Sequence, residues 1–247
     1  MSDAHELLER LAAYDSPTLS NAIEAFGVRS QAEGFAGSSC ARLVGGPAPV
    51  VGRAVTATMG SRAPRGDADQ RAALYEQVRD TDGPVLLVVV DLDGEPGHGA
   101  FLGEMQATLF SRLGAVGIAT NGAVRDLEQL RAMGFAAFAG GISVSHAYAH
   151  LVEVGVPVEL AGLRVVPGDV LHGDEHGLLG VPGRLLGALP PVADAIVEAE
   201  RAVLAWVASG HFAIGEILER LATVRSAAVS AAVSTAAPAS AAPLQAG

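Results

Sequence analysis

Apolar and polar residues follow their most regular pattern between residues 99 and 126. A helix is predicted over residues 103–113, because apolar residues recur there at helical spacing: Met105, Leu109, Phe110 and Leu113. Gly114 is expected to end this helix, as a glycine just past the last turn commonly does. The next residues, 115–120, are apolar and predict a short strand.

Two polar clusters border this strand. Residues 103–106 open the first helix, whereas Arg125-Asp126 follows a predicted turn at Asn121-Gly122 and opens another helix that ends at Gly134. Both clusters lie where a strand ends and a helix begins, which is the edge of an α/β sheet that binds ligands. The first amides of a helix also lack intrahelical acceptors and suit an anion. The pattern therefore predicts an anion site flanked by Glu104 and by the Arg–Asp pair.

The rest of the chain alternates between segments with the apolar spacing of helices and segments with the apolar pattern of strands. Helices are expected at 3–14, 17–26, 67–80, 191–208 and 214–223, and strands at 50–59, 85–91, 135–139 and repeatedly between 150 and 181. The continuous apolar run at 85–91 suits a buried parallel strand. From Ser226 the chain is rich in Ala, Ser and Pro, and residues 226–247 are expected to form a disordered tail. The predicted fold class is α/β, with one domain over residues 1–225.

Composition narrows the function. The net charge of −11 argues against nucleic acid as a direct ligand. The longest aliphatic run, at 85–90, is too short to cross a bilayer, and the N-terminus lacks the layout of a secretory signal. A single cysteine, Cys40, allows no internal disulfide and is expected to be structural. We therefore expect a cytoplasmic protein that binds neither nucleic acid nor membrane.

The sequence contains no lysine, and all 16 basic residues are arginine. Schiff-base catalysis, pyridoxal-phosphate attachment and the P-loop each need a lysine amine, so all three are excluded. Any carbon–carbon bond chemistry must then use a metal or another electron sink.

Each candidate residue has a functional and a structural interpretation. Arg125 suits a carboxylate through its planar fork, and Asp126 suits a hard divalent cation. Alternatively, Asp126 stabilises the first turn of its helix beside a surface arginine. Glu104 at its own helix start has the same two interpretations.

The histidines form a second group of candidates. His172, Asp174 and His176 alternate along a predicted strand and therefore share one face. They could ligate a metal, although three such positions on one strand lie far apart for a shared ion. The alternative is a polar face that lines a site or a subunit contact. His146 and His150 are expected in a helix or loop near a contact.

The spacing of the polar clusters resembles a known family. Glu104 lies in the segment GEMQ, and twenty residues separate it from Arg125-Asp126 in the segment NGAVRD. This spacing resembles the acid–x20–Arg–Asp signature of the family of 4-hydroxy-4-methyl-2-oxoglutarate (HMG) aldolases. The regulator of ribonuclease activity RraA belongs to the same family. Three longer segments extend the resemblance over about residues 15–210: SPTLSNAIEAFGV, LGAVGIATNGAVRDLEQLRAMGFAAFAGG and VVPGDVLHGDEHGLLGVP.

The resemblance implies a layered, swivelling-type β/β/α fold, with helices flanking a central mixed sheet. It implies a lyase that depends on Mg²⁺ or Mn²⁺ and cleaves 4-hydroxy-2-oxo acids, such as HMG, to pyruvate through a metal-bound enolate. Oxaloacetate decarboxylation would pass through the same enolate. Family members are trimers or dimers of trimers, with active sites between subunits.

The resemblance also implies roles for individual residues. The backbone amides of Gly103, Glu104, Met105 and Gln106 would hold the 2-oxo acid carboxylate. Arg125 would contact the substrate, Asp126 would ligate the metal, and Glu104 would be the second acid, a candidate for proton transfer. A glutamate of a neighbouring subunit, Glu200 or alternatively Glu198, would support the metal.

Two features leave the function open. The HGDEH and SHAYAH segments are richer in histidine than the aldolases, which leaves the natural substrate undetermined. The family also contains non-catalytic regulators that bind a ribonuclease or another protein partner. This chain retains the acid–x20–Arg–Asp set, which favours an enzyme.

Overall fold

The apolar run of the sequence forms the middle strand of a mixed sheet. In the computed structural model, which describes residues 3–93 and 95–236, this strand is β3 (Val85–Asp91), buried along its whole length. It pairs in parallel with β2 (Val50–Gly60) on one side and with β5 (Ala115–Val124) on the other. Successive side chains point to opposite faces, so apolar layers on both sides of the sheet account for a continuous rather than alternating run.

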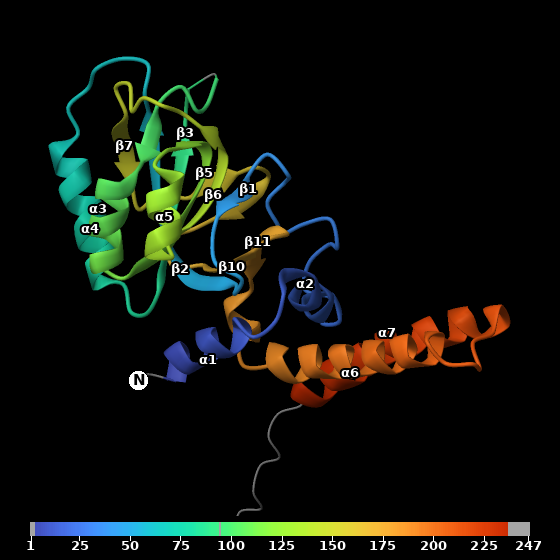
Figure 1. Ribbon diagram of the computed structural model, residues 1–247. Coiled ribbons are helices and arrows are strands. Elements are labelled where there is room, and N and C mark those ends of the chain that lie inside the picture. Colours follow the sequence, from blue (N-terminus) through green and yellow to red (C-terminus); the bar gives the residue numbers. More distant parts are fainter. Residues whose placement is uncertain (1–2, 94, 237–247) are drawn as a thin grey trace, which may run out of the picture. The chain divides into compact units, whose positions relative to one another are not determined.

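The sheet contains parallel and antiparallel pairs in the order β1-β6-β5-β3-β2-β10-β11 (Figure 1). The strands not yet bounded are β1 (Ala41–Val44), β6 (Ala136–Ile142), β10 (Val170–Asp174) and β11 (Gly177–Val181). Two further strands lie off this path: β4 (Ala100–Leu102) pairs with β5 in parallel, and β7 (His150–Val154) pairs with β2 in antiparallel. The parallel pairing of β4 with β5 brings their carboxyl ends to one edge.

Different elements cover the two faces of the sheet. Three helices, α3 (Ala68–Asp80), α4 (Glu104–Arg112) and α5 (Leu127–Met133), pack against one face of the sheet. Their side chains Leu74, Phe110 and Leu130 are buried in the core that they form with this face. The hairpin of β8 (Val158–Leu160) and β9 (Leu163–Val165) contributes to the core on the other face, together with Cys40. The predicted α/β class, with helices flanking a central mixed sheet, is confirmed.

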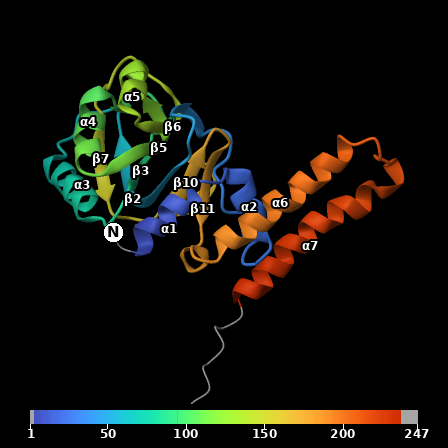
Figure 2. The ribbon, with the colours of Figure 1, turned by 60° about the horizontal axis from the view of Figure 1, so that its bottom comes forward.

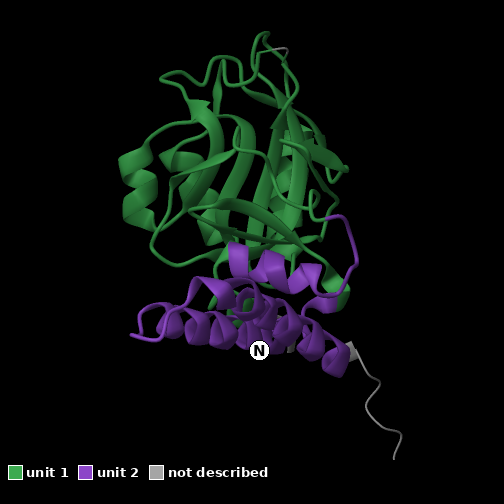
Figure 3. Cartoon of the chain, turned by 90° about the vertical axis from the view of Figure 1, so that its right-hand side faces the viewer, with its two compact units in different colours: residues 1–16, 31–184 green, residues 17–30, 185–247 purple. Residues whose placement is uncertain are grey.

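The chain divides into two compact units, whereas the sequence predicted one domain over residues 1–225 (Figure 3). Unit 1 consists of residues 1–16 and 31–184 and holds α1 (Asp3–Leu11) and the sheet. Unit 2 consists of residues 17–30 and 185–247. It holds nearly all of α2 (Ser16–Glu24), then α6 (Leu189–Val207) and α7 (Ile217–Ala236), with a short 3-10 turn at Ile214–Glu216 before α7. Another 3-10 turn, Gly183–Leu185, lies where the chain passes from unit 1 to unit 2.

Within unit 2, α6 and α7 lie side by side as a helical hairpin (Figure 2). Aromatic contacts order the connection between them. The ring of Trp206 lies 5.0 Å from that of Phe212, and the guanidinium of Arg220 lies 5.1 Å from the Trp206 ring.

The prediction of a disordered tail from Ser226 was wrong for residues 226–236, which continue α7. Alanine has the highest helix propensity, and Ala228 and Ala232, one turn apart, are buried. Small residues can therefore pack a helix closely without the large apolar side chains that the prediction required. The rest of the predicted tail, residues 237–247, lies outside the described residues.

Three local predictions also differ from the structure. The expected turn at Asn121-Gly122 is an irregularity inside β5, where the register shifts between Thr120 and Ala123. The Asn121 side chain accepts from the Asp91 amide at 2.7 Å and donates to the Asp91 carbonyl at 3.0 Å. These bonds pair the backbone N–H and carbonyl of Asp91 on the neighbouring strand β3, and the chain continues along β5 instead of turning there. Strands β1 and β4 were not predicted from the sequence, because their four and three residues carry little periodicity.

None of the helices in the described part of the chain has the length and apolar character that crossing a bilayer requires.

Candidate functional site

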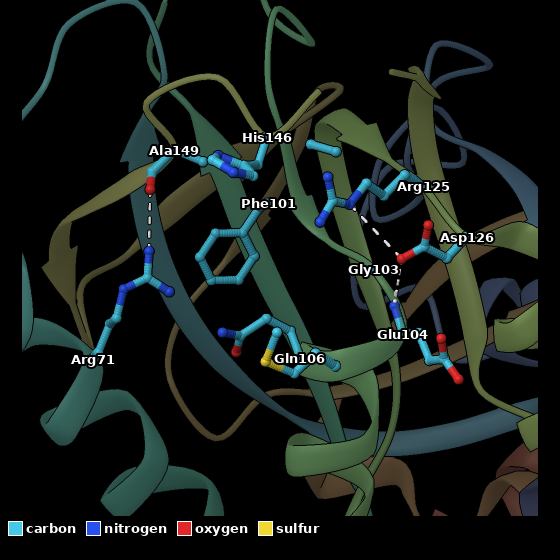
Figure 4. Close-up of a pocket in the computed structure, with 11 residues that line it drawn as sticks. Arg71, Phe101, Gly103, Glu104, Gln106, Arg125, Asp126, His146 and Ala149 are labelled. Atoms are coloured by element: carbon cyan, nitrogen blue, oxygen red, sulfur yellow. Dashed lines mark hydrogen bonds and ion pairs between the residues drawn. The ribbon is translucent and has the colours of Figure 1, made fainter. Parts of the chain in front are cut away.

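A pocket of about 470 Å³ opens in unit 1 at the carboxyl ends of β4 and β5 (Figure 4). Its lining comes from five parts of the chain: strand β4, the start of α4, the residues after β5, helix α3, and the loop before β7. The lining residues are Arg71, Ala100, Phe101, Gly103, Glu104, Met105, Gln106, Arg125, Asp126, His146 and Ala149. The two predicted polar clusters, far apart in sequence, therefore meet in one pocket.

Asp126 joins the two clusters. Its carboxylate Oδ2 accepts the backbone N–H of Glu104 at 2.9 Å. Asp126 has φ 57° and ψ 44°, the left-handed conformation, which aspartate tolerates better than most residues. This backbone position ends β5 before α5 begins at Leu127, so Arg125 and Asp126 precede the helix that they were expected to open.

Arg125 lies beside the same carboxylate. Its Nε is 3.7 Å from Asp126 Oδ2, and each of the two side chains is 36% exposed. The backbone N–H of Arg125 donates to the carbonyl of Leu102 at 3.0 Å, which ties the end of β5 to the end of β4. The pair is thus held on the pocket wall while its charged groups remain accessible.

Glycine is required at position 103 because the structure leaves no room there for a side chain. A Cβ at this position would meet the Asp126 carboxylate and would lie 2.9 Å from Cγ of Arg125. Its backbone is extended (φ −141°), so any residue could adopt the conformation, and only the close approach of the Arg–Asp pair demands glycine.

The first turn of α4 presents unpaired amides to the pocket. The N–H of Ala107 donates to the Gly103 carbonyl and begins the helical ladder, and the N–H of Glu104 is bound by Asp126. The amides of Met105 and Gln106 therefore have no intrahelical acceptor, and they carry the positive end of the helix dipole. The Gln106 side chain is oriented through its Oε1, which accepts the Tyr75 hydroxyl at 2.9 Å.

Arg71 forms the opposite wall, and sequence reasoning missed it. Its Nε lies 2.8 Å from the Asp67 carboxylate, and its Nη2 donates to the Ala149 carbonyl at 3.1 Å. The guanidinium lies 5.9 Å from the centre of the Phe101 ring. An aspartate four residues before an arginine resembles an ordinary ion pair on a helix surface, so no local signal indicated a pocket.

His146 enters the pocket from the loop before β7. Its Nδ1 lies 2.7 Å from the Ala147 carbonyl, and the neighbouring Ser145 carbonyl accepts the Ala100 amide. The prediction placed this histidine in a helix or loop near a contact, and the structure places it in a loop that lines the site. His150 is buried at the start of β7, with Nδ1 2.8 Å from the Tyr148 carbonyl.

The donor set of the pocket is compatible with a hard divalent cation. Asp126 and Glu104 are carboxylates on its lining, and Mg²⁺ commonly uses one or two carboxylates with water and substrate oxygens. No group of three His, Cys, Asp or Glu side chains in residues 3–93 and 95–236 could hold an ion by itself. Any ion held by these carboxylates would take its remaining ligands from oxygen atoms such as those of water or substrate.

The model of the family described as "RraA-like: Aldolase/RraA" matches residues 16–179. The chain belongs to the RraA-like family. The match spans both polar clusters of the pocket, so the resemblance in the sequence is confirmed.

This RraA-like chain is similar to several known proteins. It is 38% identical over 112 residues to the 4-hydroxy-4-methyl-2-oxoglutarate aldolase of Thermus thermophilus, covering 44% of the chain and 67% of that protein. It is 26% identical over 206 residues to Protein DlpA of Legionella pneumophila, covering 83% of the chain. The chain spans only about a third of the length of DlpA, 32%.

Among solved structures, RraAS2 of Streptomyces coelicolor has a TM-score of 0.61 and 26% sequence identity. The alignment covers 79% of this chain and 92% of RraAS2, which is described as an unusual member of the RNase ES inhibitor RraA protein family. The RraA-like fold predicted from the sequence is confirmed.

His172, the first histidine of the HGDEH segment, lies outside the pocket in a buried hydrogen-bonded cluster. His172 is fully buried, with Nδ1 3.0 Å from the Ser16 hydroxyl and Nε2 2.9 Å from the Tyr14 carbonyl. Asp174 accepts the backbone N–H groups of Ser16 at 2.6 Å and of His176 at 2.8 Å. His172 and Asp174 therefore bind the segment that leads into α2. The interpretation of His172, Asp174 and His176 as ligands of a shared metal was wrong.

Burial and hydrogen bonding together set the protonation of this cluster. Burial lowers the pKa of His172 and outweighs the opposing effects of Asp174 and of the Tyr14 carbonyl. Burial alone would raise the pKa of Asp174, but the hydrogen bonds from Ser16 and His176 outweigh it and lower the pKa. Neutral His172 is then a donor through Nε2 and an acceptor through Nδ1, which satisfies both partners.

Cys40 is buried beneath the sheet, as its structural interpretation expected. Its Sγ lies 3.6 Å from the Thr120 carbonyl, and burial raises the pKa of the thiol to about 11. The thiol is therefore protonated at neutral pH and does not take part in the pocket.

Glu198 and Glu200 lie on α6 in unit 2. They are two residues apart, so they project from the helix roughly 200° from one another. Only one of them can therefore face a given neighbouring surface.

Proposed function

We propose that this RraA-like chain is a divalent-metal-dependent aldolase that cleaves 4-hydroxy-2-oxo acids, such as HMG, and releases pyruvate. One observation carries the proposal: the free amides of α4 and the Arg125–Asp126 pair line one pocket. The similarity to an HMG aldolase over 112 residues supports it. Oxaloacetate decarboxylation is a second reaction that the same site would catalyse, because it develops charge on the same atoms.

The amides of Met105 and Gln106 would bind the carboxylate of the 2-oxo acid. They are the amides of the first turn left without an acceptor, and the helix dipole favours an anion there. This binding would direct the 2-oxo group toward Arg125 and Asp126. Of the four backbone amides carried over from the family, these two are the ones that the helix geometry favours.

Arg125 would stabilise the charge that develops during cleavage. When the C3–C4 bond breaks, the C4 hydroxyl loses its proton and becomes a carbonyl, and the electron pair passes through C3 onto the 2-oxo oxygen. An accessible guanidinium near this oxygen lowers the energy of the resulting pyruvate enolate. A divalent ion held by Asp126 would supply Lewis-acid polarisation of the same oxygen. The absence of lysine supports this route, since a Schiff base cannot form.

Glu104 is the proposed proton-transfer group. Its side chain is exposed, and Figure 4 shows its carboxylate on the Asp126 side of the pocket, away from Arg71 and Phe101. There it could accept the C4 hydroxyl proton, either directly or through a water molecule, and return a proton to C3.

The assembly proposed with this function is a homotrimer or a hexamer. A neighbouring subunit would contribute Glu200, or alternatively Glu198, to the metal at Asp126. The resemblance to family members that are trimers or dimers of trimers supports this assembly. We propose a cytoplasmic location and neither nucleic-acid nor membrane partners, in keeping with the charge of −11.

A non-catalytic regulator is the second candidate function. The observation that favours it is the similarity of the fold to RraAS2, whose family is described as RNase ES inhibitors. Such a regulator would bind a ribonuclease or another protein, and it would need neither the metal nor the free amides of α4.

Pyruvate alone distinguishes the two functions. An aldolase of this type must deprotonate the methyl group of bound pyruvate, so in heavy water with Mg²⁺ the methyl protons should exchange faster than without protein. Arg125→Ala should slow this exchange by about 100- to 1,000-fold. Arg112→Ala, at the other end of α4 and exposed, is the matched control and should leave the exchange unchanged.

Proton NMR measures the exchange directly. Excess EDTA followed by dialysis should abolish it, and added Mg²⁺ or Mn²⁺ should restore it. Binding of pyruvate without exchange above background would reject the aldolase and leave the regulator, which a ribonuclease inhibition assay would then test.

A further inference from the structure

The pocket contains a histidine that the proposed function does not use. His146 is exposed in the loop before β7, and it is the one histidine among the described residues that line the pocket. Figure 4 shows its ring on the side of Phe101 and Ala149, across the pocket from Asp126 and Glu104. Imidazole is the side chain best suited to take up or release a proton near neutral pH.

One hydrogen bond sets which nitrogen of the ring is free. His146 Nδ1 lies 2.7 Å from the backbone carbonyl of Ala147, which can only accept. In the neutral ring, Nδ1 therefore carries the hydrogen and Nε2 keeps a lone pair. Within residues 3–93 and 95–236, Nε2 has no hydrogen-bond partner. Nε2 is thus the atom that can take up a proton while the bond at Nδ1 stays in place and stabilises the imidazolium.

The loop that carries His146 is held against the pocket wall. The carbonyl of Ser145 accepts the Ala100 amide at 2.9 Å, and the carbonyl of His146 accepts the Ala149 amide at 2.9 Å. Ala147 has φ 45°, in the left-handed region that is costly for a residue with a Cβ. Such strain persists where the surrounding contacts fix the backbone, and it is common at functional sites. The imidazole is therefore presented from a fixed backbone tied to β4, the strand that leads into α4.

The proposed binding mode directs the substrate toward this histidine. The carboxylate at C1 would lie on the amides of α4, and the 2-oxo group at C2 would lie beside Arg125 and Asp126. The carbon chain beyond C3 would then continue along the remaining lining, where Figure 4 shows Phe101 and His146. C4 is two bonds from C2, so its hydroxyl would be the reacting group nearest to the imidazole.

We propose that Nε2 of His146 accepts the C4 hydroxyl proton during aldol cleavage. As this O–H bond breaks, C4 becomes a carbonyl, the C3–C4 bond breaks, and its electron pair forms the enolate. Glu104 then keeps only the second of the two proton transfers given to it above, in which it passes a proton from water to C3. The imidazolium releases its proton to water, so protons balance over the cycle. This inference deepens the proposed function and rests on it.

Three reactions at one site separate the two proton transfers. Cleavage of HMG requires the loss of the C4 hydroxyl proton. Decarboxylation of oxaloacetate breaks a C3–C4 bond without any hydroxyl, and exchange of the pyruvate methyl protons involves C3 alone. His146→Gln should therefore slow HMG cleavage by about 100- to 1,000-fold and leave the other two rates within about threefold of wild type. Pyruvate release measures the first two reactions, and proton NMR in heavy water measures the third.

Further variants separate a chemical role from a structural one. His98→Gln changes an exposed histidine just before β4 that lies outside the pocket lining, and it should keep all three rates. Glu104→Gln should slow the methyl exchange that His146→Gln leaves intact. Free imidazole added to His146→Ala should restore part of the HMG cleavage, which a purely structural histidine would not allow. Thermal unfolding of each variant shows whether the fold is intact.

The possible results are distinct. HMG cleavage that survives His146→Gln, or an equal fall of all three rates, would overturn the role of His146 while the enolate site stands. A wild-type protein that exchanges pyruvate protons but does not cleave HMG would reject aldol cleavage and the step assigned to His146. A wild-type protein that catalyses none of the three reactions would reject the proposed function and this inference with it.

Discussion

At the scale of single residues, Asp126 combines two tasks that a variant can separate. Its Oδ2 accepts the Glu104 amide, and its charge makes it the proposed metal ligand. Asparagine also tolerates φ 57° and can accept the same amide through its carbonyl oxygen, so it should preserve the local backbone.

We therefore expect Asp126→Asn to fold normally and to bind Mg²⁺ or Mn²⁺ at least about tenfold more weakly. Manganese titration followed by electron paramagnetic resonance measures the affinity. Unchanged affinity would remove Asp126 from the proposed metal site, and Asp126→Ala, which also loses the amide contact, shows the separate cost of that contact.

Gly103 offers a second test at this scale, because space alone requires it. In Gly103→Ala the new methyl group must displace the Asp126 carboxylate and the Arg125 side chain. Overpacking of this kind costs about 1–3 kcal/mol of stability. Exchange of pyruvate methyl protons should fall along with it, since both charged groups move.

Gly141→Ala is the comparison, since no atom lies near the position of its Cβ. This variant should leave both stability and exchange close to wild type. Equal behaviour of the two alanine variants in chemical denaturation and in NMR exchange would contradict the tight approach at Gly103.

At the scale of secondary-structure elements, β10 supports the start of α2 through His172. Burial lowers the pKa of this imidazole in the folded protein below the unfolded value of about 6.5. The unfolded chain therefore binds a proton at a higher pH than the folded chain does. The stability that neutral His172 contributes is present above the unfolded pKa and is lost as the pH falls through the folded pKa.

We expect the free energy of unfolding to decrease between about pH 7 and pH 5, and His172→Gln to reduce this dependence. Urea denaturation across the pH range measures it. His211→Gln, at an exposed position in unit 2, should retain the wild-type slope. A slope that His172→Gln leaves unaltered would assign the pH dependence to other groups.

At the scale of the whole molecule, the proposed trimer predicts that active sites are shared. Exposed apolar side chains on the α6–α7 hairpin, Ile214 and Leu218 among them, provide surface for a contact between copies. Light scattering at micromolar concentration should report a trimer or a multiple of three, and a monomer would contradict the proposal.

Mixing of variants tests the shared site more directly. Asp126→Asn and Glu200→Gln should each be inactive alone and should regain pyruvate exchange when their subunits are mixed and reassembled. The same mixture with Glu198→Gln shows which glutamate reaches the metal, because the two lie on different sides of α6. Failure of both mixtures would place the complete site within one chain.

The sequence by itself determined the elements whose signals are local and repeated. Helix 67–80 and strand 85–91 are confirmed nearly to the residue as α3 and β3. The acid–x20–Arg–Asp spacing indicated the family and brought Glu104, Arg125 and Asp126 forward as candidates. Periodicity and spacing suffice there, because each reports a backbone geometry that repeats along the chain.

Tertiary structure alone decided which other residues join or leave the site. Arg71 reaches the pocket because α3 packs beside the loop that carries Ala149, a contact between segments 78 residues apart. His172 lies outside the pocket because its side chain on β10 binds Ser16, 156 residues away. Helix α7 continues past Ser226 because buried Ala228 and Ala232 pack closely. No local pattern encodes such contacts, since each depends on where a distant part of the chain lies after folding.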